Sequence, residues 1–82
     1  MKEFEINNKT IVFNGFEDEA VIDKKFAENF LNYAEEKKEE KDGVIEKVTV
    51  TKADEKNADI DIKYVQDKPK IERIRRITGY SL

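Results

Sequence analysis

The sequence predicts a two-layer α+β domain, an antiparallel sheet with one long helix packed on one of its faces. Four stretches are typical of strands, residues 3–6, 10–13, 44–51 and 58–64. The second is β-branched and aromatic, and the other three alternate apolar and polar residues with the period of half-buried strands. Between the second and third of these stretches, apolar residues recur every three or four positions, as in an amphipathic helix. A chain of 82 residues has the size of one domain, so we treat 1–82 as a single domain with the order β-β-α-β-β-β.

The first two predicted strands form a hairpin. Asn7, Asn8 and Lys9 separate them, and asparagine tolerates the positive φ that tight hairpin turns require. The second strand is rich in β-branched and aromatic residues, which favour extended structure. Asn14-Gly15 follows it and predicts its end.

The helix is predicted from about Glu17 to Asp42. Asp18 and Asp23 are both candidates for its N-cap, and the sequence does not distinguish between them. Gly43 is placed to end the helix in a left-handed conformation. The residues that recur at helical spacing form its apolar stripe: Ile22, Phe26, Phe30 and Tyr33.

The next two strands form an antiparallel hairpin. Val44, Val48 and Val50 alternate with mostly polar residues, and 58–64 repeats the pattern with one apolar face. The polar segment 53–57 is typical of the connecting turn.

The last segment permits two interpretations. Ile71, Ile74 and Ile77 are spaced by three, which places them within about a 120° arc of a helix. In a strand, Ile74 would face away from the other two. The β-branched residues favour a strand that runs into a terminal loop, and Pro69 separates it from the preceding hairpin.

The predicted core lies between the helix and one face of the sheet. It draws on the inward positions of the strands and on the apolar stripe of the helix. Its members are Phe4, Ile6, Ile11, Phe13, Phe26, Phe30, Val48, Val50, Ile60, Ile62 and Tyr64.

The composition excludes several classes of chemistry. The chain has no cysteine and no histidine, so it lacks thiolate nucleophiles, the usual zinc ligands and the usual general base at neutral pH. Asp59 and Asp61 lie two residues apart, but the outward face of a hairpin is the natural place for such a pair. We therefore predict no catalytic residues, no metal site and no cofactor when the chain acts alone.

The N-terminal residues and the length of the apolar runs predict where in the cell the protein is located. Residues 1–5 are charged and are not followed by the apolar region of a signal peptide. No apolar run approaches the ~20 residues that span a bilayer. We expect a cytoplasmic protein without a membrane partner.

Charge is distributed unevenly along the chain. Nineteen acidic and sixteen basic residues leave a net charge of −3, yet residues 68–82 carry five bases and one acid. These bases are the candidate binding residues: Lys68, Lys70, Arg73, Arg75 and Arg76.

Three interpretations of this basic segment follow, in order of preference. The bases neutralise acidic residues of their own domain, bind an acidic protein partner, or grip nucleic-acid phosphates while Tyr64 and Tyr80 stack on bases. The net negative charge of the whole chain disfavours the third. Oligomeric state is not predicted.

The end of the chain carries one motif, Ile74-Arg75-Arg76-Ile77-Thr78-Gly79-Tyr80. It resembles the glycyl-radical motif at the C-terminal end of anaerobic ribonucleoside-triphosphate reductases. The resemblance implies that Gly79 corresponds to the glycine that carries a radical installed by an S-adenosylmethionine enzyme. A glycine Cα radical is stabilised between the amide nitrogen and the carbonyl, and a backbone without Cβ can be approached closely.

The chain also departs from that family. It is too short for the family's large barrel, and it has neither the thiyl-forming cysteine nor the zinc-binding cysteines. The working hypothesis is therefore a non-catalytic accessory or protein-interaction domain related to these reductases, with the basic C-terminal strand as its contact surface. Two alternatives remain: a detachable glycyl-radical subunit that acts with a larger enzyme, using Gly79 with Arg76, Ile77, Thr78 and Tyr80, and a weak nucleic-acid-binding module.

Overall fold

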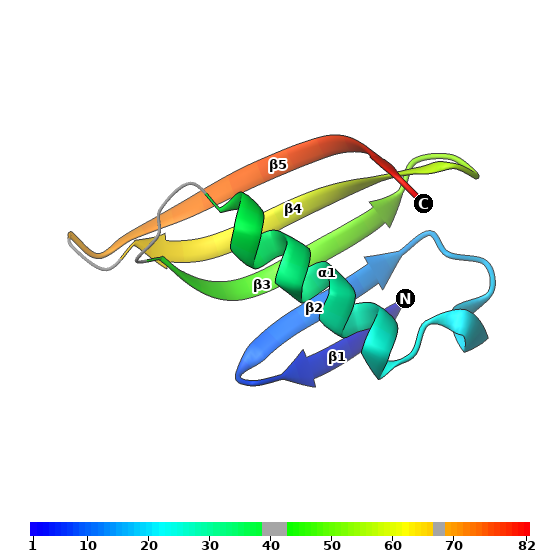
Figure 1. Cartoon of the computed structure of the whole chain (residues 1–82), viewed down its shortest axis with the longest axis horizontal. Helices are drawn as coiled ribbons and strands as arrows, with labels where there is room; N and C mark the ends of the chain where they lie inside the picture. Colours follow the sequence, from blue (N-terminus) through cyan, green and yellow to red (C-terminus); the bar gives the residue numbers. More distant parts are fainter. Residues whose placement is uncertain (39–42, 67–68) are drawn as a thin grey trace.

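The computed structural model describes residues 1–38, 43–66 and 69–82, and it has an α+β fold with one sheet and one α-helix (Figure 1). The five strands are ordered β1-β2-β3-β4-β5 across the sheet. A short 3₁₀ helix, η1, precedes the α-helix. The elements are β1 (Lys2–Ile6), β2 (Lys9–Asn14), η1 (Glu19–Val21), α1 (Lys24–Lys37), β3 (Val44–Lys52), β4 (Asn57–Gln66) and β5 (Ile71–Ser81).

The sheet is mixed, so the prediction of an antiparallel sheet is wrong at one pair of strands. β2 runs parallel to β3, in a register from Thr10↔Lys47 to Asn14↔Thr51, whereas the other three pairs are antiparallel. The physical reason is the connection. A helix that joins two neighbouring strands carries the chain back to the starting end of the sheet, so both strands then run in the same direction.

The predicted first hairpin is confirmed. Asn7 and Asn8 have φ values of 52° and 66°, as the central residues of a two-residue hairpin turn require. The turn sets the register from Ile6↔Lys9 to Lys2↔Phe13.

The helix is shorter than predicted at both ends. Asp18 caps η1 by accepting a hydrogen bond from the Ala20 amide, and Asp23 caps α1 by accepting one from the Phe26 amide at 2.8 Å. Each of the two N-cap candidates therefore caps a different element. At the other end Lys38 is already extended, so Gly43 does not end the helix; the predicted last residues, 39–42, lie outside the described residues.

No helix among the described residues is long and apolar enough to cross a membrane.

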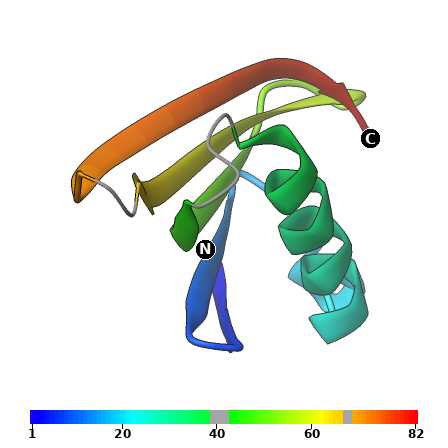
Figure 2. The same cartoon turned by 60° about the vertical axis from the view of Figure 1, so that its left-hand side comes forward.

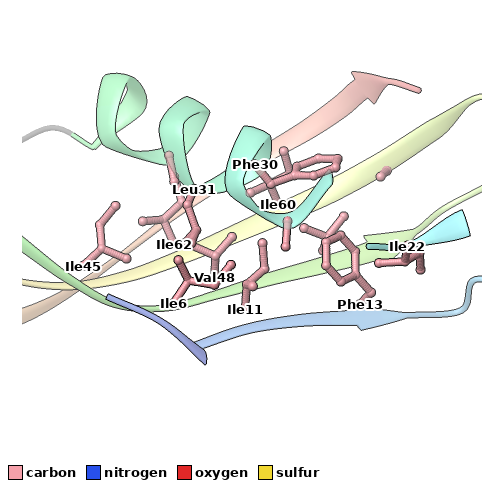
Figure 3. Packing of buried hydrophobic residues seen from close by; sticks show 14 of the residues in the cluster. Ile6, Ile11, Phe13, Ile22, Phe30, Leu31, Ile45, Val48, Ile60 and Ile62 are labelled. Carbon is pink, nitrogen blue, oxygen red and sulfur yellow. The ribbon is translucent and has the colours of Figure 1, made fainter. Parts of the chain in front are cut away.

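The core lies between α1 and the sheet (Figures 2 and 3). Nine of the eleven predicted core residues are buried, while Phe4 and Phe26 pack partly buried against the cluster. Phe13 is its aromatic centre, with ring centroids 5.6–6.2 Å from those of four other phenylalanines. Seven further hydrophobic residues among those described are buried that the predicted core did not include: Val12, Ile22, Ala27, Leu31, Ala34, Ile45 and Ala58.

A bulge in β3 explains one error in the predicted apolar faces. The register with β4 shifts between Ile45 and Lys47, so one extra residue enters the strand and the alternation changes phase. Ile45 is therefore buried, whereas Val44, predicted on the apolar face, is 61% exposed.

The last segment is a strand, as the β-branched content favours. β5 pairs with β4 along its whole length and continues to Ser81, so the predicted terminal loop does not begin before that residue. Ile74 is 72% exposed, while Ile77 packs against the core. Their side chains lie on opposite faces, as expected of a strand.

Candidate functional site on strand β5

β5 forms one edge of the sheet. It is eleven residues long, and it pairs with β4 from Asn57↔Ser81 to Gln66↔Ile71. It is the last strand in the sheet order, so among the described strands none pairs with its other side. An edge strand presents backbone N–H and C=O groups that can accept a further strand.

The two faces of β5 carry different side chains. Residues that pair directly across a sheet share a face. Arg73, Arg75, Ile77 and Tyr80 pair with buried residues of β4, and we call their side the inner face. Ile74, Arg76 and Glu72 lie on the opposite side, the outer face, where Ile74 pairs with Lys63, Arg76 with Asp61 and Glu72 with Val65.

On the outer face, part of the basic segment neutralises its own domain. Arg76 lies 3.3 Å from Asp61 and 3.7 Å from Asp59, so this pair of carboxylates is bound by a guanidinium. Lys63 lies 3.8 Å from both Glu46 and Glu72. All of these side chains are exposed or half-buried, so each ion pair contributes only about 0–1 kcal/mol.

The remaining candidate bases are spread along the strand and the turn before it. The exposed Arg73 donates a hydrogen bond from Nε to Gln66 Oε1 at 2.8 Å, and Arg75 is half-buried on the inner face. Lys70 is exposed and lines a shallow pocket with Val44, Glu46 and Val65. Lys68 lies outside the described residues.

Gly79 occupies a bulge in β5. The register with β4 shifts between Ala58 and Ile60, so Thr78 and Gly79 together lie opposite Asp59. Gly79 has a φ of +72°, a conformation that other residues adopt only at a cost. The bulge is therefore a structural reason for glycine at this position.

The predicted tyrosine pair does not form a stacking platform. Tyr64 is only 1% exposed, so its ring is covered by the core. Tyr80 is half-buried, with ring centroids 5.2 Å from Phe30 and 4.9 Å from Tyr33 on α1. The structure does not support the prediction that both rings are available to nucleic-acid bases.

A small apolar pocket lies where β5 meets α1. Its volume is about 180 Å³, below the roughly 300–1,000 Å³ typical of small-molecule sites. The sequence does not indicate this pocket, because unbroken alternation along β5 would turn Tyr80 to the outer face. Its lining residues are Phe26, Asn29, Phe30, Tyr80, Ser81 and Leu82.

The described residues offer no arrangement typical of catalysis. No group of three or more acidic side chains among them is placed to hold a metal ion. Among the described carboxyl groups, those of Glu35 and Asp54 have pKa values below their ordinary ones. Both accept hydrogen bonds that favour the charged form: Glu35 from Lys38 and Lys9, and Asp54 from the Lys56 and Asn57 amides and the Asn57 side chain.

No protein-family model, no curated protein and no solved structure matches this chain.

Proposed function

We propose that this chain is a non-catalytic protein-interaction domain in which the β5 edge accepts an acidic, extended segment of a larger protein as an additional strand. One observation carries the proposal. All three arginines of the chain, Arg73, Arg75 and Arg76, lie on this edge strand. Main-chain pairing at a sheet edge gives affinity, and flanking side chains give specificity.

The arginine side chain suits this role. Its planar fork of donors binds carboxylates in two-pronged geometry, which lysine, elsewhere the only basic residue of the chain, cannot reproduce. We further propose that the fold has two layers, the sheet and the helix. In that arrangement α1 covers the inner face of the sheet, and β5 together with the outer face remains for the partner.

Other occupants fit the edge less well. Pairing of β5 with β5 of a second copy would bring two sets of arginines together, and like charges facing one another destabilise a strand pair. Nucleic acid would meet a chain of net charge −3 without the Tyr64 ring to stack on. An acidic segment avoids the repulsion between two sets of arginines, and it pairs through its backbone without needing the Tyr64 ring.

The test is the affinity for an extended acidic peptide of about ten residues in which glutamate alternates with valine, measured by fluorescence anisotropy. Arg73→Glu should weaken binding about tenfold or more, because it replaces an attractive charge on the edge with a repulsive one. Lys25→Glu makes the same change in charge at an exposed position of α1 and should leave the affinity nearly unchanged.

Backbone pairing is tested separately with methylated peptides. Methylating alternate peptide nitrogens removes the N–H groups along one edge of the peptide only. One of the two methylation patterns should abolish binding, and the other should preserve it. Equal affinity for both patterns, or equal effects of Arg73→Glu and Lys25→Glu, would contradict the proposal, because charge alone would then explain the binding.

A second candidate is the detachable glycyl-radical subunit, with Gly79 as the radical carrier. Two observations favour it beyond the motif itself. Gly79 is exposed, and a Cβ built there would meet no atom within 4 Å, so another protein could approach its Cα. In this candidate, Arg76, Ile77, Thr78 and Tyr80 are recognised by a larger enzyme of the anaerobic reductase type.

Anaerobic incubation with a radical-activating enzyme and S-adenosylmethionine tests the second candidate. A doublet in the electron paramagnetic resonance spectrum, followed by oxygen-induced cleavage at Gly79, would support it. A silent spectrum with intact chain would eliminate it and leave the interaction domain unaffected.

A further inference from the structure

The pocket at the end of β5 continues the edge strand. Tyr80 and Ser81 are the last residues of β5, and both line the pocket together with Phe26 and Phe30 of α1. A segment paired along β5 would therefore reach the pocket without leaving the strand. In Figure 3 the Phe30 side chain lies between α1 and the strands beneath it.

The bulge at Gly79 places the Tyr80 side chain in the pocket at the end of β5. Ile77 lies on the inner face, so an unbroken alternation would place residue 79 on that face and Tyr80 on the outer one. The extra residue opposite Asp59 changes the phase, so the Tyr80 ring packs on Phe30 and Tyr33 instead. The aromatic wall of the pocket is thus a consequence of the bulge.

The size of the pocket limits its occupant. About 180 Å³ is too little for a typical small-molecule ligand. It suits one large apolar side chain of a docked segment, and such buried anchors commonly dominate the affinity of an interface.

We infer that the acidic segment carries one large apolar side chain, aromatic or branched, at its N-terminal end, and that this side chain sits in the pocket of Phe26, Phe30 and Tyr80. The inference rests on the proposed function and specifies its partner. Antiparallel pairs are slightly more stable than parallel ones. In antiparallel pairing, the N-terminal end of the segment lies beside the C-terminal end of β5. The acidic residues then follow beside Arg75 and Arg73, which share the inner face with Tyr80.

Three peptides of alternating glutamate and valine test at which end of the segment the large apolar side chain lies. The first has phenylalanine at the N-terminal end, the second has the same composition with phenylalanine at the C-terminal end, and the third has serine in place of phenylalanine. Fluorescence anisotropy should show the first binding about tenfold tighter than the other two, because only its phenylalanine reaches the pocket.

Variants that narrow the pocket complete the test. Asn29 is exposed on α1 and lines the pocket, so Asn29→Met fills space there without a change of charge. It should remove the preference for the first peptide and leave the affinity for the serine peptide unchanged. Asn32→Met, at an exposed position of the same helix outside this pocket, should preserve the preference.

The outcomes separate this inference from the proposed function. If the serine peptide binds and the two phenylalanine peptides bind equally, or the second binds more tightly, the pocket inference is wrong and the edge proposal stands. If no peptide binds, both are wrong. A preference for the first peptide that persists in Asn29→Met also overturns the inference.

Discussion

At the scale of single residues, the end of β5 depends on one backbone conformation. Gly79 adopts a positive φ at the bulge, and this conformation turns the Tyr80 ring towards α1. No side chain or backbone atom lies near the position of a Cβ on Gly79. Substitution there therefore tests backbone strain without a steric clash.

Gly79→Ala is expected to lower the free energy of unfolding by about 1–2 kcal/mol, the cost of a left-handed conformation for a residue with a Cβ. Gly79→Asn should cost less, since asparagine tolerates this region. Urea unfolding measures both. Thr78→Ala, at the neighbouring bulge residue, is the control and should change stability little. An unchanged free energy of unfolding in Gly79→Ala would show that the positive φ is not required.

Glu35 links α1 to the first hairpin. Its carboxylate lies 2.9 Å from both Lys9 Nζ and Lys38 Nζ. Burial by itself raises the pKa of Glu35, but the hydrogen bonds and charges of Lys38 and Lys9 outweigh it, so the pKa lies below the ordinary value of 4.5. A carboxyl group whose pKa is depressed on folding stabilises the fold above its unfolded pKa, and that contribution disappears as the pH falls through the folded pKa.

Glu35→Gln should therefore lower stability at about pH 7, and the difference from the unaltered protein should shrink as the pH falls below 4.5. Urea unfolding across this range measures it. Glu28→Gln removes the same charge from an exposed position of the same helix and is the matched control. A difference for Glu35→Gln that stays constant with pH would contradict the assignment.

At the scale of elements, the patterns that were predicted correctly are those set by neighbouring residues. The strands, the Asn7–Asn8 turn and the hairpin of β3 and β4 follow from period-2 alternation and turn residues. The burial of Tyr64 and the exposure of Ile74 follow from the same period. Local sequence is enough for features of this kind.

The errors in the predicted fold arise where contacts between distant residues set the strand pairing, or where one inserted residue sets which face a side chain occupies. The parallel pairing of β2 with β3 depends on which strands meet after the helix returns. The bulges near Glu46 and Gly79 each change the phase of a strand by one residue, which no periodicity count detects. The pocket depends on the second bulge, so the sequence could indicate the basic strand but not the pocket beside it.

The two helix caps give a prediction at this scale. Asp23 caps the fourteen-residue α1, which carries part of the core, whereas Asp18 caps only the three-residue η1. Asp23→Ala should reduce the free energy of unfolding by about 1 kcal/mol. Asp18→Ala should have a smaller effect, measured by the same urea titration. Equal effects would mean that the cap of α1 does not limit stability.

At the scale of the whole molecule, a small core has to hold a chain in which 43% of the residues are charged. Domains of this size have a net stability of about 5–15 kcal/mol. The aromatic cluster around Phe13 joins β1, β2 and α1, since its neighbours include Phe4, Phe26 and Phe30. The fold therefore depends strongly on a few large side chains.

Phe13→Ala should cost about 3–5 kcal/mol, from lost burial and the cavity left behind, and so remove a large part of the total stability. Thermal unfolding followed by circular dichroism measures the effect. Val21→Ala truncates a side chain that is 65% exposed and should change stability by less than about 0.5 kcal/mol. A small loss of stability in Phe13→Ala would indicate that the aromatic cluster is not central to the core.

Amide hydrogen exchange, followed by NMR as the phenylalanine-first acidic peptide is added, tests the central claim most directly. Amides of β5 that point away from β4 should gain protection at every second residue from Ile71 to Ile77, before the bulge shifts the alternation, because the peptide pairs with them as a sixth strand. Protection at another surface, or none along β5 when the peptide is bound, would contradict the account.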